Sequence, residues 1–262
     1  MAAAQFANAP VQNTNVVWGA PEREQLKKNT VTGTFPYLET PEGNLAETYA
    51  IIQYFAANFN EKLLGTNSAE QSQVNQWVQF AQQEITRYNK DLIYPLLGFT
   101  EHNAAAASNA HKQVVQWVKV LDAHMAGKSF IVGNEITLAD LENFYPLRLY
   151  FQFVFTEAIR QSIPNVTAWF TKLMVHPILL KCYGRTLLCK VAQTAPVLPK
   201  LVNIKKNIQN FNKLIKKLTK FNKINKLTIT LTETRRTQIQ CYCPKSHGRR
   251  KIRQRSNCFR KR

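Results

Sequence analysis

Apolar side chains recur with helical spacing almost without interruption from Ser68 to about Val191, and this pattern limits the fold more than any other feature of the sequence. Residues three or four positions apart lie on one face of a helix, so a stripe with this spacing predicts an amphipathic helix. One stripe consists of Val74, Trp77, Val78, Ala81, Ile85 and Tyr88, and a second of Val114, Trp117, Val118, Leu121 and Met125. Each helix must bury its stripe against another element, so we expect an all-α bundle over residues 68–195.

Polar residues and a glycine mark the expected helix ends. Ser68, with Gln71 three residues later, predicts the N-cap of the first helix, and Gly127 predicts the C-cap of the second. Thr137 and Asp140 have the spacing of a capping box, in which each side chain accepts a hydrogen bond from the other residue's backbone amide. We expect this pair to be a structural cap.

The first 64 residues show mixed secondary-structure signals. Short β-prone runs are followed by turn residues or by helical periodicity. The β-prone runs are Asn15–Trp18 and Thr34–Glu39, and the helical segments are Glu22–Lys28 and Leu45–Phe59. A strand-helix-strand unit takes roughly 30 residues, and the first strand of such a unit would here have to lie before Met1, so this is too little material for a complete α/β domain. We therefore expect an incomplete α/β domain over residues 1–64, whose first strand lies before Met1.

The chain of 262 residues carries a formal net charge of +19, and nearly all of the excess lies in its last quarter. Residues 201–262 contain 19 Lys and Arg and a single acidic residue, Glu233. Apolar residues alternate with lysines at helical spacing over residues 204–227, and the segment Arg249–Arg255 is densely basic. The composition predicts a basic tail over residues 200–262, disordered or partly helical, whose partners would be RNA or another anionic surface, bound weakly.

The basic tail is also compatible with having no binding partner. A run of like charges is often a solvated segment that binds nothing specific. Residues 200–226 are moreover drawn largely from amino acids with A/T-rich codons, while acidic residues stop abruptly, as they would after a shift of reading frame. A binding segment, a solvated segment and a frame-shifted segment therefore all stay open as hypotheses for residues 200–262.

Composition and motif spacing argue against several classes of protein. No stretch approaches about 18 uninterrupted apolar residues, so we expect no membrane-spanning helix. The first residues lack the basic and apolar regions of a secretion signal, and the five cysteines do not form a paired framework, so we expect a cytoplasmic protein. Cys241, Cys243, His247 and Cys258 lack the spacing of a zinc knuckle, and the other histidines are scattered. We expect no metal site.

Two motifs together resemble the glutathione transferase family. Phe35-Pro36 lies ahead of a strand-like run and Glu47-Thr48 lies at the start of a helix, as in the thioredoxin-like half of that family. Phe130–Leu141 is similar to the capping motif of its helical half. The resemblance implies a mainly α fold of the glutathione transferase type. Its parts would be an incomplete thioredoxin-like domain over residues 1–64 and an all-α C-terminal domain over residues 68–195, followed by the basic tail.

The same resemblance implies a binding site for glutathione, although it implies no required cofactor. The family's proline is cis, and the backbone of the residue before it pairs with the peptide backbone of glutathione. These positions correspond to Pro36 and Phe35. Glu47 and Thr48 would hold the γ-glutamyl end, because amides at a helix start favour an anionic carboxylate.

Within that family, several segments resemble the gamma subunits of eukaryotic translation elongation factor 1. They include Val74–Val78, Tyr94–Gly98 and Phe151–Arg160, and the resemblance covers roughly residues 3–192. It implies a non-catalytic scaffold that binds the nucleotide-exchange subunits of the factor in protein synthesis. A homodimer is a further implied assembly.

A glutathione-dependent transferase is the alternative function. Such an enzyme needs a hydroxyl or thiol that stabilises the thiolate of glutathione. In the family this residue lies on a loop that we expect to precede Met1. Tyr37 and Tyr49 lie near the implied binding residues, but the alternation of side chains there favours packing. We therefore assign no catalytic residue.

We predict that the tail is dispensable for folding of the preceding residues. The first 200 residues carry 16 basic and 15 acidic side chains, whereas repulsion within the tail opposes compaction. A chain truncated after Ala195 should melt within about 3 °C of the full chain, and RNA bound by the full chain at low salt should dissociate at high salt. A larger drop in melting temperature, or RNA binding that survives high salt, would contradict this prediction.

Overall fold

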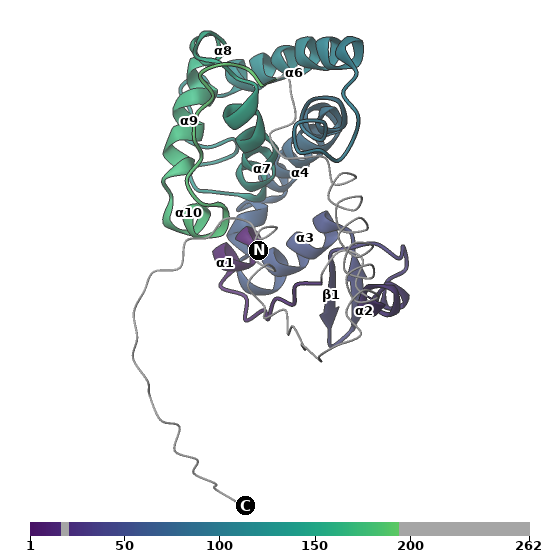
Figure 1. The fold of residues 1–262 in the computed structure, drawn as a ribbon. Coiled ribbons are helices and arrows are strands. Elements are labelled where there is room, and N and C mark those ends of the chain that lie inside the picture. The colour runs from purple at the N-terminus through teal and green to yellow at the C-terminus, as the bar shows by residue number, and fades with distance from the viewer. Residues whose placement is uncertain (17–20, 194–262) are drawn as a thin grey trace, which may run out of the picture.

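The computed structural model describes residues 1–16 and 21–193, which form a small α/β part and a larger helical part (Figure 1). The α/β part consists of α1 (Ala2–Ala7), α2 (Pro21–Leu26), η1 (Lys27–Asn29), β1 (Tyr37–Thr40), β2 (Gly43–Ala46), α3 (Thr48–Phe59) and η2 (Glu61–Leu64). The helical part consists of α4 (Ser68–Phe80), the π-helical turn η3 (Ala81–Ile85), η4 (Thr86–Tyr88), α5 (Asn89–Leu92), α6 (Ala104–His124), α7 (Leu138–Phe153), α8 (Glu157–Gln161), α9 (Pro164–Met174) and α10 (Pro177–Tyr183). The predicted mainly α architecture is confirmed.

In the described chain the sheet has two strands, β1 and β2, which form an antiparallel hairpin. Tyr37 pairs with Ala46 and Thr40 with Gly43, whose φ of +133° is a conformation that glycine tolerates. The prediction of a helix from Leu45 was wrong, because the first two residues of that segment complete β2 instead. Their conformation depends on pairing with β1, and local periodicity in the sequence does not reveal that pairing.

The β-prone run at Asn15 is not a strand in its described portion. Asn15 and Val16 have no regular secondary structure, and the rest of the run lies in residues 17–20, outside the described ranges. The predicted strand at Thr34–Glu39 is confirmed in part as β1, and the predicted helical turn at Glu22–Lys28 as α2 and η1.

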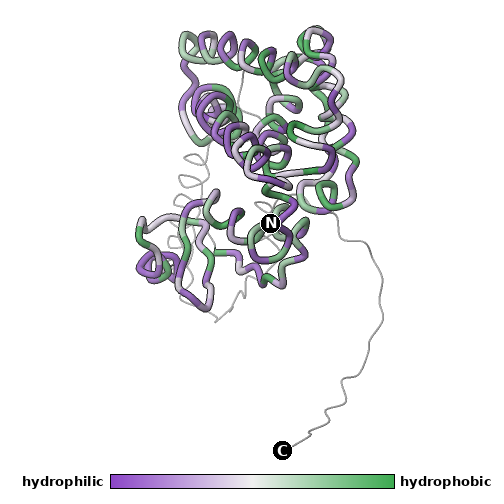
Figure 2. The backbone as a smooth tube through the Cα atoms, turned by 180° about the vertical axis from the view of Figure 1, so that it is seen from behind, coloured by the Kyte–Doolittle hydropathy of each residue, from purple (hydrophilic) through white to green (hydrophobic). Residues whose placement is uncertain are grey.

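The core of the helical part surrounds α7. Ten of its sixteen residues are buried, and an apolar helix buried on most sides is typical of the centre of a bundle. Phe151 stacks on Phe170 of α9 with ring centroids 3.9 Å apart, and the hydroxyl of Tyr150 donates to the carbonyl of Ile85. Figure 2 shows hydrophobic and hydrophilic residues alternating along the surrounding helices, as their amphipathic sequences require.

Both predicted helix ends differ from the structure by one or two residues. Asn67, not Ser68, is the N-cap of α4, because its side-chain oxygen accepts from the amides of Ala69 and Glu70. The C-cap of α6 is Met125, and Gly127 follows with a φ of +72°. Which of several adjacent residues becomes the cap depends on contacts in the folded chain. Local spacing therefore predicts a helix end to within one or two residues, but not the exact cap.

The chain after α10 folds back along the end of α7. The amides of Cys189 and Gln193 donate to the carbonyls of Phe151 and Phe153, both at 2.8 Å. Nη1 of Arg160 donates to the carbonyls of Cys189 and Phe155, at 2.6 and 2.5 Å. We call residues 185–193 the C-terminal strap. Its amides occupy two carbonyls at the end of α7 that lack helical partners, and the Arg160 side chain joins the Cys189 carbonyl of the strap to the carbonyl of Phe155, two residues beyond α7.

We predict that Arg160→Met destabilises the protein by about 1–3 kcal/mol, because it removes two charge-assisted hydrogen bonds to carbonyls that are partly shielded from water. Thermal unfolding would show this as a loss of several degrees. Arg87→Met is the matched control, since Arg87 is exposed and stacks on Tyr88. Equal melting temperatures for the two variants would show that Arg160 does not hold the strap.

Candidate functional site

The hairpin register brings the four residues of the expected glutathione site to one end of the sheet. Because Tyr37 lies opposite Ala46, Phe35 and Pro36 just before β1 leave the sheet at the same end as Glu47 and Thr48 just after β2. Phe35 is half-buried and the other three are exposed. The Phe35–Pro36 peptide is cis, as the family resemblance implies.

The start of α3 is open to an anion. Glu47 precedes the helix with a φ of +68°, which is rare for a residue other than glycine, and its side chain makes no hydrogen bond to the helix amides. The first amides of a helix lack intrahelical acceptors and carry a partial positive charge. The site therefore offers a carboxylate-binding helix end next to the Glu47 carboxylate, which suits a ligand carrying both charges. A strained residue at such a position is typical of functional sites.

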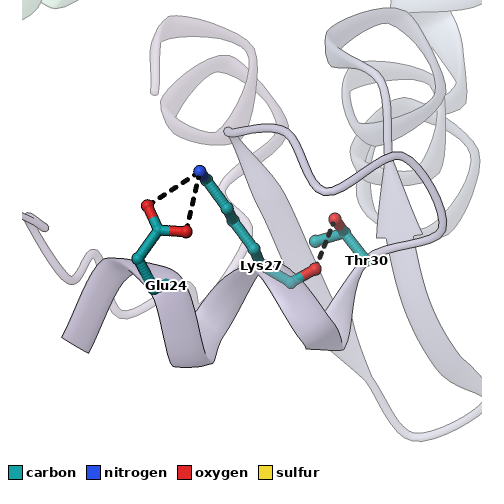
Figure 3. Close-up of polar contacts among 3 residues, drawn as sticks. All are labelled: Glu24, Lys27 and Thr30. Atoms are coloured by element: carbon teal, nitrogen blue, oxygen red, sulfur yellow. Dashed lines mark hydrogen bonds and ion pairs between the residues drawn. The ribbon is translucent and has the colours of Figure 1, made fainter. Parts of the chain in front are cut away.

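The α2 helix adds a cation to this region. The guanidinium carbon of Arg23 lies 4.3 Å from the centroid of the Phe35 ring, a cation–π contact. Figure 3 shows how the next turn is held: Lys27 Nζ contacts both carboxylate oxygens of Glu24 at 2.8 and 3.0 Å, and the Thr30 hydroxyl donates to the Lys27 carbonyl. Sequence reasoning missed Arg23, because no periodicity or motif connects it with Phe35.

The hydroxyls of Tyr37 and Tyr49 have other partners. Tyr37 donates to Glu39 on the same strand at 3.0 Å. Tyr49 donates to Asn75 of α4, which ties α3 to the helical part. Burial, and then the nearby charge of Glu142, raise the pKa of Tyr49, so this side chain stays a neutral phenol.

The expected cap, Thr137 and Asp140, forms a buried network at the start of α7. Asp140 is 0% exposed and accepts four hydrogen bonds. One oxygen accepts from the amide of Ile131 at 3.0 Å and from Nε1 of Trp169 at 2.8 Å, and the other from the amide and hydroxyl of Thr137. Burial raises the pKa of Asp140, while these hydrogen bonds act in the opposite direction. The pair is part of the packing of the helical part, and none of the four donors to Asp140 comes from the hairpin end.

Residues 1–16 and 21–193 hold no candidate metal site and no candidate membrane helix. No three His, Cys, Asp or Glu side chains gather there in a way that could hold a metal ion. Among the helices in these ranges, none has the length and apolarity needed to cross a membrane. The group Cys241, Cys243, His247 and Cys258, like the basic tail, lies outside the described ranges.

Both parts of the fold match known families. Residues 2–63 match "Glutathione S-transferase, N-terminal domain" and residues 81–177 match "Glutathione S-transferase, C-terminal domain". A theta class glutathione S-transferase from the citrus canker pathogen Xanthomonas axonopodis pv. citri, solved with glutathione bound, has a TM-score of 0.62 at 18% identity, covering 72% of this chain and 91% of that chain. The chain belongs to the glutathione transferase superfamily, and the predicted fold is confirmed.

Within the superfamily, the chain is similar to elongation factor 1-gamma. It is 31% identical to the Artemia salina protein over 193 residues, and 32% identical to the Homo sapiens protein over 162 residues. These alignments cover 72% and 62% of this chain but 44% and 37% of those relatives, so the chain spans less than half their length. The GST-like domain of elongation factor 1-gamma from Saccharomyces cerevisiae has a TM-score of 0.63 at 21% identity, covering 75% of this chain and 92% of that chain.

We predict that Asp140→Ala lowers the free energy of unfolding by about 2–4 kcal/mol, because the buried donors around it would lose their acceptor. Trp169→Phe removes a single donor and keeps the ring buried, so it should cost about 1 kcal/mol. Chemical denaturation of both variants measures the difference. Equal losses would show that cavity formation and packing, and not the hydrogen bonds of the carboxylate, set the cost.

Proposed function

We propose that the chain is a gamma-type subunit of translation elongation factor 1, a non-catalytic scaffold that binds the nucleotide-exchange subunits in the cytoplasm. The supporting observation is the similarity to elongation factor 1-gamma, which runs through both the α/β part and the helical part. A fold of this type hosts several functions, so the site and the surface must support the proposal as well. The division into residues 1–64, 68–195 and the tail belongs to the same proposal.

A segment near the end of the described chain is rich in exposed apolar side chains, which supports the scaffold role. Five of the twelve exposed large hydrophobic residues in the described ranges fall within seventeen positions: Val175, Leu180, Leu187, Leu188 and Val191. Leu187 and Val191 are 70% and 73% exposed. Exposed large apolar side chains are available there to contact another protein, and buried apolar area is a main source of binding free energy.

The site supports binding of glutathione more than its activation. The cis-proline turn and the open start of α3 offer groups for the peptide backbone and for the γ-glutamyl carboxylate, with Phe35, Pro36, Glu47 and Thr48 as the binding residues. Activation needs a hydroxyl aimed at the thiol, and both nearby tyrosine hydroxyls donate elsewhere. We infer that glutathione is a ligand here and not a substrate.

The scaffold proposal predicts a stable complex with purified nucleotide-exchange subunits of elongation factor 1. Leu187→Ser should weaken this complex about threefold to tenfold, because it removes an apolar contact from the proposed surface. Val120→Ser is the matched control, since Val120 is also exposed but lies on α6. Isothermal titration calorimetry on the full chain gives both affinities, and equal weakening by the two variants would contradict the proposed surface.

The scaffold proposal and the transferase alternative predict opposite results in an assay of glutathione conjugation. Under the scaffold proposal, the chain conjugates glutathione to an electrophilic aromatic substrate no faster than the uncatalysed reaction. Turnover well above that rate, abolished by Glu47→Ala, together with no complex with the exchange subunits, would make the transferase the primary function.

A further inference from the structure

A pocket of about 440 Å³ lies between the turn of the β1–β2 hairpin and the second half of α3, and we call it the turn pocket. The hairpin packs beside α3 (Figure 1). Thr40, Glu42 and Asn44 line the pocket from the hairpin, and Tyr54 and Asn58 line it from α3. Its volume lies within the range of small-molecule sites.

The turn pocket and the glutathione site lie at opposite ends of the hairpin. The pocket lies at the Thr40–Gly43 pair, whereas the residues of the glutathione site lie beyond the Tyr37–Ala46 pair. These two pairs are three residues apart along each strand, which corresponds to about 10 Å at about 3.4 Å per residue. The two sites share no residue, so a small ligand in one does not occupy the other.

Both hydroxyl groups that line the turn pocket already donate to protein oxygens. The hydroxyl of Thr40 donates to the carbonyl of Gly43 at 2.7 Å. The hydroxyl of Tyr54 donates to Oε2 of Glu42 at 3.3 Å, which places the carboxylate beside the phenol group. The hydroxyl protons are therefore engaged within the protein and are not offered to an anion.

The two asparagine side chains of the pocket are oriented by backbone carbonyls. Nδ2 of Asn44 donates to the carbonyl of Asn29 at 2.8 Å, and Nδ2 of Asn58 donates to the carbonyl of Tyr54 at 2.9 Å. Neither Oδ1 atom accepts a hydrogen bond from the described part of the chain. An amide whose nitrogen is engaged keeps its oxygen as an acceptor, so the pocket offers two amide oxygens to a ligand.

Glu42 gives the turn pocket a negative charge. It is the only ionised side chain among the lining residues that the structure describes. No Lys, Arg or His of residues 1–16 and 21–193 lies within ion-pair distance of its carboxylate, and Oε1 has no hydrogen-bond donor in the same ranges. The free groups of the pocket are thus a carboxylate oxygen and two amide oxygens, all of them acceptors.

The ring of Tyr54 adds a flat aromatic surface to these acceptors. In the described ranges it meets the ring of Phe55 edge-on, with centroids 6.4 Å apart, and no Lys or Arg lies over it. The face of a tyrosine ring attracts a cation. The ring and the carboxylate therefore favour the same kind of ligand.

We propose that the turn pocket binds a guanidinium group, held at the Glu42 carboxylate and against the Tyr54 ring. A guanidinium carries five N–H donors and no acceptor, so it complements a pocket whose free groups are acceptors. Its planar fork matches a carboxylate and stacks on an aromatic ring, whereas an ammonium lacks this planar shape. The site is independent of the proposed scaffold function and of glutathione binding.

The test titrates butylguanidinium into the isotope-labelled full chain and follows the backbone amide signals of Gly43 and Asn44 by NMR. Because the Glu42 carboxylate is exposed, its ion pair is weakened by water, and Glu42→Gln should lower the affinity about three- to fivefold. Glu39→Gln is the matched control, since Glu39 is an exposed carboxylate of β1 that does not line the pocket, and it should change the affinity by less than about twofold. Saturating glutathione should leave the binding unchanged.

Three further probes define which part of the ligand is recognised. Butylurea, which is neutral, and butylammonium, which has the charge without the planar fork, should each bind more weakly than butylguanidinium. N-acetyl-arginine N-methylamide distinguishes the two sources of a guanidinium. Equal or tighter binding than butylguanidinium would assign the site to an arginine of a partner protein, and weaker binding would assign it to a free guanidino compound.

The proposal would be overturned by the absence of saturable shifts at the turn amides, or by equal affinity in Glu42→Gln and the unaltered protein. Equal binding of butylurea or butylammonium would also overturn it. Displacement of butylguanidinium by glutathione would do the same, because the probe would then occupy the glutathione site. None of these outcomes bears on the complex with the exchange subunits, so the scaffold proposal fails or holds separately.

Discussion

The carboxylate of Asp140 is the interaction on which the arrangement of the helical part depends. It is fully buried and joins three segments: the loop at Ile131, the start of α7 at Thr137, and α9 through Trp169. The carbonyl of the same Ile131 residue contacts Nε2 of His124 at 2.8 Å, which links α6 to the network. A buried charge is costly unless its hydrogen bonds are satisfied, so the network favours one placement of these helices.

Parts of this fold that depend on local spacing were predictable from the sequence. The two predicted apolar stripes are buried except at Tyr88 and Trp117, which are half-buried, and the first stripe continues past α4 into η3 and η4. The Thr137–Asp140 spacing gives the cap. The bond from Trp169 to Asp140 was not predictable, because 29 residues separate the two and no pattern connects them. Strand β2 was not predicted for a related reason, because only its pairing with β1 shows that Leu45 is extended.

The candidate site also has features that were predictable from the sequence and features that were not. Resemblance suggested Phe35, Pro36, Glu47 and Thr48 as candidate binding residues, and the hairpin register places both pairs at the same end of the sheet. The positive φ of Glu47 and the stacking of Arg23 are properties of the folded chain. Neither has a signature in the sequence, since backbone strain is held by surrounding structure and a cation–π contact needs no fixed spacing.

The C-terminal strap determines where the rest of the chain is attached. Two backbone hydrogen bonds and the Arg160 side chain hold it against the end of α7, which has more buried residues than any other helix of the described chain. A pulling force on the chain beyond Gln193 would therefore act on the hydrogen bonds of the C-terminal strap before it reached α10. A partner that bound the basic tail would therefore be joined to the body through this point on the central helix.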